Sequence, residues 1–92
     1  MIKGFRDRDT ESLANNRYVK QFDSIQLSAR RKLDILKVAR GLPDLAAVPG
    51  NRLEALHGDR EGQYSIRIND QYRICFVPEG DDFNDVEITD YH

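Results

Sequence analysis

The second half of the chain alternates apolar and polar positions with a period of two. The alternation occurs in three stretches, separated by segments rich in Asn, Asp and Gly. A period of two is typical of a half-buried β-strand, whose successive side chains point to opposite faces of a sheet. We therefore predict three strands joined by hairpins, at about 63–68, 72–77 and 85–90.

The first half of the chain has a helical period instead. Apolar side chains recur at spacings of four, four and three, which places them on one face of a helix: Ile25, Ala29, Leu33 and Leu36. Asp23 or Ser24 can cap the first turn, and Gly41 can end the last one. The pattern predicts a main helix at about 24–40, preceded by a short helix that begins near Asp9.

A helical half followed by a strand-rich half predicts an α+β fold, with helices packed on a mostly antiparallel sheet. Ninety-two residues suffice for one domain, so we expect a single domain over 1–92. The chain has no run of ~20 apolar residues, so no membrane span is expected. A single cysteine, Cys75, cannot form an internal disulfide, and a cytoplasmic protein with a buried strand cysteine is the simpler interpretation.

The register of the first hairpin decides which side chains face solvent. A two-residue loop would place Arg73 on the apolar face of the sheet. A three-residue loop at 69–71 pairs Ile68 with Tyr72 and keeps that face apolar throughout. Because a slip of one residue exchanges the two faces, we predict the three-residue loop. The same register sets Arg67 directly opposite Arg73 on the polar face.

The third strand adds more polar side chains to this face, which gathers Arg67, Arg73, Glu87, Thr89 and Tyr91. Two interpretations of the arginine pair remain open. In one, Glu87 and Asp90 neutralise the arginines and form a salt-bridged surface that contributes little stability. In the other, a phosphate group lies between the guanidinium groups, which bind phosphate oxygens in a bidentate way.

His92 follows this face at the end of the sequence. A terminal histidine is by default a solvated side chain. An imidazole beside a tyrosine, an aspartate and an arginine also fits the chemistry of RNA strand cleavage. That reaction needs a base for the 2′-OH proton, a cation for the phosphate and an acid for the leaving 5′ oxygen. It needs no metal, and two histidines 35 positions apart with one cysteine match no zinc spacing. We therefore expect neither a metal nor a cofactor.

The charges are distributed unevenly. Residues 1–49 have ten Lys/Arg against six Asp/Glu, whereas residues 50–92 have four against ten. Proteins that bind nucleic acid through a general electrostatic attraction are usually basic, so any RNA contact here must be local. The main helix carries basic residues that form either a solvated face or a surface for ribosomal RNA or an acidic partner: Arg30, Arg31 and Lys37.

The stretch G-N-R-L-E-A-L-H-G-D-R-E-G-Q-Y-S-I-R-I-N-D-Q-Y-R-I-C-F, with V-E-I-T-D-Y-H at the end, resembles the HigB toxins of the RelE/ParE superfamily. The resemblance implies a compact RelE-like α+β domain. It implies a toxin of a type II toxin–antitoxin system that enters the ribosome and cuts the translated mRNA by metal-independent 2′-OH attack. The implied partners are the ribosome, mRNA and a HigA-type helix-turn-helix antitoxin, with operator DNA contacted only through the antitoxin complex.

The resemblance also assigns roles to residues. It makes Arg73 the phosphate-contacting arginine and matches Asp90, Tyr91 and His92 to a catalytic C-terminal tripeptide. Two positions depart from the family pattern. Glu54 stands where some members have a catalytic histidine, and His57 stands where a lysine is usual.

These departures leave several interpretations open. Glu54 is a candidate base or ion-pair partner, His57 is either a catalytic or RNA-binding group or an exposed loop residue, and Arg67 is a candidate RNA contact. A ParE-like toxin that acts by protein binding is one alternative function. The other is an attenuated toxin that serves mainly as a co-repressor with its antitoxin.

Overall fold

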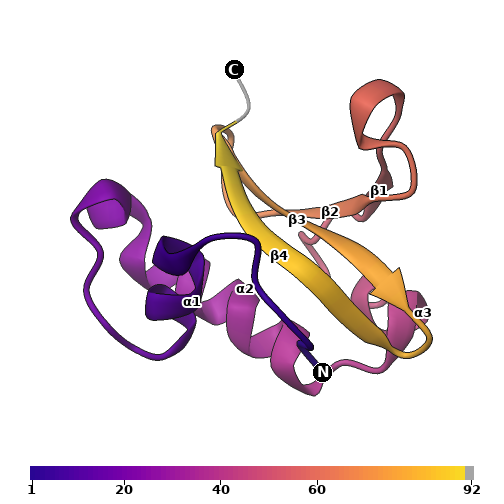
Figure 1. Cartoon of the computed structure of the whole chain (residues 1–92), viewed down its shortest axis with the longest axis horizontal. Coiled ribbons are helices and arrows are strands. Elements are labelled where there is room, and N and C mark those ends of the chain that lie inside the picture. The colour runs from indigo at the N-terminus through magenta and orange to yellow at the C-terminus, as the bar shows by residue number, and fades with distance from the viewer. Residues whose placement is uncertain (91–92) are drawn as a thin grey trace.

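The computed structural model describes residues 1–90 and has the predicted α+β architecture. The helices are α1 (Arg8–Ala14), α2 (Gln26–Val38) and α3 (Gly41–Ala46), with 3₁₀ segments η1 (Lys20–Ile25) and η2 (Gly58–Arg60). The strands are β1 (Glu54–Ala55), β2 (Tyr64–Arg67), β3 (Tyr72–Glu79) and β4 (Asp82–Asp90). They form one antiparallel sheet in the order β1-β2-β3-β4 (Figure 1).

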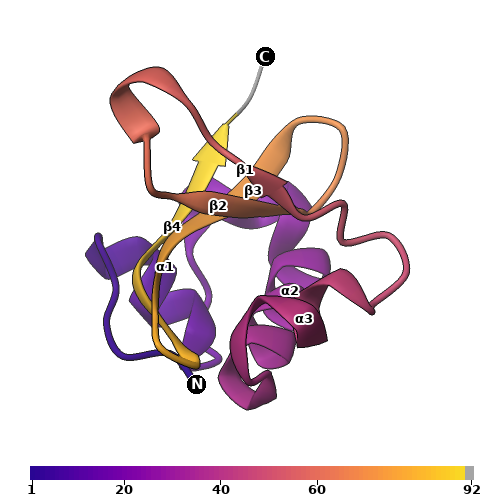
Figure 2. The ribbon, with the colours of Figure 1, turned by 90° about the vertical axis from the view of Figure 1, so that its right-hand side faces the viewer.

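The helices cover one face of the sheet, and the core lies between the two layers (Figure 2). Ile66 pairs with Ile74, and Ile74 pairs with Ile88, which gives an apolar row across three strands. Leu33 and Leu36 of α2 belong to the same buried cluster. Full burial of one such side chain contributes roughly 1.5–3 kcal/mol. This row fixes the register, and therefore fixes which side chains lie on the opposite face.

α1 begins earlier than the sequence predicted, because Asp7 caps it instead of Asp9. Asp7 Oδ2 accepts a hydrogen bond from Thr10 N at 2.9 Å, and Asp7 Oδ1 accepts one from the Thr10 hydroxyl at 2.7 Å. The same hydroxyl oxygen accepts a bond from Ile88 N at 3.1 Å. The fully buried Thr10 therefore links the helix cap to β4.

The predicted cap of α2 at Asp23 or Ser24 is wrong. η1 occupies that stretch, and α2 starts at Gln26 without a side-chain cap. Gln26 Nε2 donates to the carbonyls of Val19 and Phe22, both at 2.9 Å, and so ties the first turn of α2 to the preceding segment. The main helix is shorter than the predicted 24–40 because the chain becomes extended at Ala39.

Gly41 begins α3 and does not directly end α2. Its φ of 73° lies in the left-handed region that favours glycine. The Gly41 N–H donates to the carbonyl of Asp81 at 2.9 Å, in the turn between β3 and β4. This glycine therefore connects the helical layer to the far end of the sheet.

The three-residue loop of the first hairpin is confirmed. Ile68 N donates to the carbonyl of Tyr72 at 3.0 Å. Asn69 Oδ1 accepts hydrogen bonds from the backbone N–H groups of Gln71 and Tyr72, at 2.9 and 2.8 Å. An asparagine side chain can bond the backbone that follows it, which explains how this loop forms without glycine.

The second hairpin is longer than predicted, since β3 continues to Glu79 and β4 starts at Asp82. The regular pairing of β3 with β4 is interrupted by a register shift between Cys75 and Val77, and Asp85 on β4 has a φ of 50°. One extra residue in β4 changes the alternation of faces. The bulge therefore allows both Phe83 and Val86 to be fully buried on the apolar side.

The outer edge of β4 is covered by the N-terminal segment. It forms two isolated parallel bridges with β4, Ile2 with Phe83 and Phe5 with Val86. The other edge carries β1, a two-residue strand that the alternation did not reveal. Among residues 1–90, the helices are too short or too polar to span a bilayer.

Candidate functional site

Arg67 on β2 and Arg73 on β3 are direct cross-strand partners, as the register predicted. They lie on the face of the sheet opposite the apolar row, because neighbouring residues in a strand point to opposite faces. Arg67 forms an ion pair with Asp70 in the hairpin loop. The Asp70 side chain is exposed, so this pair contributes little to stability.

The Arg73 side chain is buried, with only 9% of its surface exposed, which differs from the expected solvated position. Its Nε donates to Ser65 Oγ at 2.7 Å. Its Nη2 donates to the carbonyl of Arg52 at 2.5 Å and to the carbonyl of Ser65 at 3.4 Å. All three acceptors are neutral oxygens, so these bonds orient the guanidinium group without neutralising its charge.

Glu87 does not neutralise the arginine pair. Its carboxylate lies 3.2 Å from Arg60 Nη1, an ion pair that joins β4 to the loop at 56–63. Asp90 accepts a hydrogen bond from Gln71 Nε2 at 3.1 Å. The salt-bridged interpretation is therefore contradicted for Glu87, and Asp70 is the carboxylate that pairs with Arg67.

Glu54 lies at the edge of the same region. It is exposed on β1 and is the cross-strand partner of Ser65, the residue that holds Arg73. His57 is exposed and precedes η2 without forming a side-chain cap. The loop at 56–63 and the end of β4 rise on the side of the sheet away from the helices (Figure 1). The fold thus gathers Glu54 and Arg73 around Ser65.

Thr89 completes the described part of this face. It pairs with Arg73, and Asp90 pairs with Tyr72. The first residue of the D-Y-H sequence is therefore one position from the strand partner of Arg73. The catalytic assignments to Tyr91 and His92 lie outside the described residues.

The comparisons with known proteins agree with this geometry. The family model for the RelE-like toxin HigB of type II toxin–antitoxin systems matches residues 3–92. The chain belongs to the HigB-like toxin family. It is 49% identical over 53 residues to Toxin HigB-1 of Vibrio cholerae serotype O1, which covers 58% of this chain and 56% of that toxin.

A second relative is an uncharacterized protein of Haemophilus influenzae, 38% identical over 56 residues. That match covers 61% of this chain and 55% of the relative. The chain thus spans little more than half the length of either protein. The family model, which covers nearly the whole chain, carries the assignment to the HigB-like family.

The basic residues that we considered for ribosome contact differ in their exposure and their partners in this HigB-like toxin. Lys37 Nζ donates to the carbonyl of Ala14 and lies 3.3 Å from Asp34. Arg30 is half-buried and bonds Gln26 Oε1 at 3.3 Å, whereas Arg31 is exposed. Arg31 is the most open of the three, and Lys37 is half-buried like Arg30.

Lys32 is a basic residue that the helical pattern did not single out. Its Nζ donates to Asn51 Oδ1 at 2.6 Å. Burial lowers the pKa of Lys32, and the positive charges of Arg31 and Arg67 lower that pKa further. Lys32 of α2 therefore lies close enough to Arg31 and to Arg67 of β2 for their charges to act on it. No sequence period signals this contact.

Ser65 was also missed, although the sequence contained a signal for it. It precedes Arg67 by two positions, so the predicted register already placed both on the polar face. Its full burial and its bonds to Arg73 appear only in the structure.

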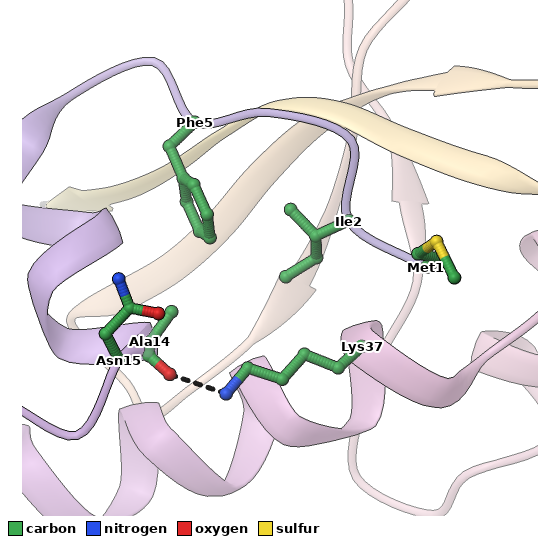
Figure 3. Close-up of a pocket in the computed structure, with 6 residues that line it drawn as sticks. All are labelled: Met1, Ile2, Phe5, Ala14, Asn15 and Lys37. Carbon is green, nitrogen blue, oxygen red and sulfur yellow. Dashed lines mark hydrogen bonds between the residues drawn. The ribbon is translucent and has the colours of Figure 1, made fainter.

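A cavity of about 190 Å³ lies elsewhere, between the N-terminal segment, the end of α1 and α2 (Figure 3). Met1, Ile2, Phe5, Ala14, Asn15 and Lys37 line it. The Lys37 side chain crosses toward the Ala14 carbonyl in this view. The cavity contains none of the predicted catalytic residues. Among residues 1–90, no three His, Cys, Asp or Glu side chains are grouped closely enough to hold a metal ion.

Proposed function

We propose that this HigB-like toxin is a ribosome-dependent endoribonuclease that inhibits translation by cutting mRNA, without a metal ion. The observation that carries the proposal is that the Arg73 side chain is buried and held in one orientation. Its guanidinium group is held by neutral oxygens and keeps its positive charge, one strand away from the residue that precedes D-Y-H. A charged and oriented guanidinium is suited to a phosphate group.

In the proposed reaction, Arg73 binds the phosphate between two nucleotides of the mRNA. A base removes the proton of the 2′-OH, and the 2′ oxygen attacks phosphorus. The bond from phosphorus to the 5′ oxygen breaks, and an acid protonates that oxygen. The products are a 2′,3′-cyclic phosphate and a free 5′-OH. Correctly placed acid and base groups each contribute ~10²–10⁴-fold.

The candidates for the two proton transfers are Glu54, His57, Asp90 and His92. Glu54 and Asp90 are carboxylates on the two outer strands of the sheet that carries Arg73. Tyr91 is the candidate to stack on or orient the RNA. Arg67 is a candidate phosphate contact, since Asp70 is its exposed and exchangeable partner.

The acidic turn between β3 and β4 lies away from this proposed site. Glu79, Asp81 and Asp82 lie in or next to the β3–β4 turn, which Figure 1 shows at the opposite end of the sheet from the end of β4. Part of the acidic excess of the C-terminal half therefore lies away from Arg73. In addition to its burial, the positive charges of Arg31 and Arg67 act on Lys32 and lower its pKa.

We also propose that a HigA-type helix-turn-helix antitoxin neutralises the protein and that operator DNA is contacted only through their complex. Membership of a family of toxin–antitoxin proteins supports this partner. Co-expression with the neighbouring open reading frame tests it. Relief of growth arrest is the expected result, and continued arrest would count against a neighbouring antitoxin.

The test of the activity is inducible expression of wild type, Arg73→Ala and a variant without His92, followed by primer extension on a translated mRNA. Wild type is expected to arrest growth and to produce new 5′ ends inside the reading frame, whereas both variants do neither. Growth arrest with intact mRNA would favour the ParE-like alternative, in which the toxin acts by protein binding. Weak arrest by wild type, with few new 5′ ends in the mRNA, would favour the attenuated co-repressor.

A further inference from the structure

We infer that Asn51 is a positioning residue for Arg73, because it holds the backbone whose carbonyl orients the guanidinium group. Asn51 lies outside the strands, and its hydrogen bonds within the described residues go to groups other than Arg73. It acts through Arg52, the next residue in the chain, whose carbonyl accepts a hydrogen bond from Arg73 Nη2. The inference rests on the proposed function, in which Arg73 binds the phosphate.

Asn51 is fully buried, and four neighbours satisfy its polar groups. Its side-chain Oδ1 accepts from Lys32 Nζ at 2.6 Å, and its Nδ2 donates to the carbonyl of Leu45 at 3.0 Å. Its backbone carbonyl accepts from Arg67 N at 2.7 Å, and its N–H donates to the carbonyl of Val48 at 3.3 Å. The residue is therefore fixed simultaneously to α2, to α3 and the turn that follows it, and to β2.

The backbone of Arg52 has an unusual conformation, and the hydrogen bonds of Asn51 help to maintain it. Its φ of 45° lies in the left-handed region, which residues other than glycine rarely adopt. Its side chain is exposed, so packing of that side chain does not explain the conformation. Strained backbone persists where the surroundings hold it, often at functional sites. Here the bonds of Asn51 hold the chain on the N-terminal side of Arg52 and keep its carbonyl directed at Arg73.

Ser65 holds the guanidinium group from the other side. Its hydroxyl accepts from Arg73 Nε, and its carbonyl accepts from Nη2. Arg73 is therefore clamped between β2 and the segment at 51–52, which are separate parts of the chain. Losing the acceptors of Ser65 or that of Arg52 leaves the positive charge of Arg73 in place. It changes only the orientation of the guanidinium group. A misdirected guanidinium slows the chemical step, because small displacements of a catalytic group are costly.

The first measurement is the cleavage rate on ribosome-bound mRNA for Asn51→Ala and Ser65→Ala. We expect each rate constant to fall by up to about 10²-fold, with little change in the half-saturating ribosome concentration. Thr10→Val is the matched control, since it removes a buried hydrogen-bonding group far from Arg73 in the sequence. It is expected to lower stability and to leave the cleavage rate of the folded protein unchanged.

The second measurement does not depend on activity. The Nε–H of Arg73 is buried and hydrogen-bonded, so in ¹⁵N-arginine-labelled protein its signal is expected to exchange slowly with water. The signal is assigned by its loss in Arg73→Lys. Exchange is expected to accelerate at least about tenfold in Asn51→Ala and to stay slow in Thr10→Val.

The outcomes separate this inference from the proposed function. If Arg73→Ala cuts mRNA like wild type, the proposed function of Arg73 is wrong. If Arg73→Ala is inactive while a folded Asn51→Ala keeps the wild-type rate and exchange, only the positioning role is wrong. Should Asn51→Ala not fold, Lys32→Met removes a single bond to Asn51 at a partly exposed position. Unchanged Arg73 exchange in Lys32→Met would then overturn the inference.

Discussion

Arg67 and Arg73 face each other across β2 and β3, yet their guanidinium groups use separate acceptors. Arg67 pairs with the exposed Asp70, whereas Arg73 bonds the neutral oxygens of Ser65 and Arg52. Like charges opposite each other in a sheet destabilise it. The two side chains reduce that repulsion by turning toward different partners. One arginine is partly neutralised, and the other remains charged and fixed.

This difference predicts unequal effects of two matched substitutions. Arg73→Ala is expected to abolish mRNA cleavage, because it removes the oriented charge at the phosphate. Arg67→Ala is expected to reduce cleavage only several-fold, since its charge is already paired with Asp70. The measurement is primer extension in a cell-free translation reaction with equal amounts of each protein. Equal losses in the two variants would contradict the separate roles.

The same pair predicts unequal effects on stability. Arg73→Ala leaves the buried hydroxyl of Ser65 and the carbonyl of Arg52 without their donor, which is expected to cost about 1–3 kcal/mol. Arg67→Ala breaks a pair with an exposed partner and is expected to cost less than about 1 kcal/mol. Urea unfolding gives both values. A larger loss for Arg67→Ala would show that the burial of Arg73 contributes little.

The Asp7–Thr10 link predicts that the start of α1 stabilises β4. Asp7→Ala removes a helix cap and is expected to cost about 0.5–2 kcal/mol. Thr10→Val also leaves Ile88 N without its acceptor, so it is expected to cost at least as much. Hydrogen exchange at Ile88 distinguishes the two, because only Thr10→Val removes its partner directly. Unchanged exchange in Thr10→Val would contradict the link.

The exposed position of His57 predicts that a substitution there can increase toxicity. The side chain is exposed in the loop that rises beside the sheet, at a position where the family pattern carries lysine. Lysine carries a compact and fixed positive charge at neutral pH, which suits it to contact a phosphate group. His57→Lys is therefore expected to strengthen growth arrest and to increase mRNA cleavage, with His57→Gln as the uncharged control. A decrease in both variants would instead assign an imidazole role to His57.

The lowered pKa of Lys32 predicts that the stability of the folded protein depends on pH. Its pKa in the folded protein is lowered from the ordinary value of 10.5, so the unfolded chain binds its proton more tightly. Between the folded and the unfolded pKa, the unfolded state carries more protons, and stability from this group rises with pH. Below the folded pKa, its full destabilising effect is present. Lys32→Gln is expected to show a smaller rise in urea stability toward pH 10 than wild type, and an identical rise would contradict this.

Much of the sheet was predictable because the apolar face allows one register. Ile66, Ile74 and Ile88 must all reach the core, and this requirement alone places Arg67 opposite Arg73. The bulge at Asp85 was not predictable from alternation, since it depends on burying Phe83 and Val86 together. The start of α2 was also missed, because Gln26 bonds earlier carbonyls and no Asp or Ser cap is used.

The α+β class, the hairpin register and the family follow from the amino-acid sequence alone, because local periodicity and a contiguous motif carry that information. The direction of the Arg73 charge instead depends on tertiary contacts. Its acceptors are Ser65 on the neighbouring strand and Arg52, which lies 21 positions away in the chain. The position of Arg52 depends in turn on Asn51 and its bonds to α2 and α3. Contacts between segments so far apart follow from packing, and no local pattern contains them.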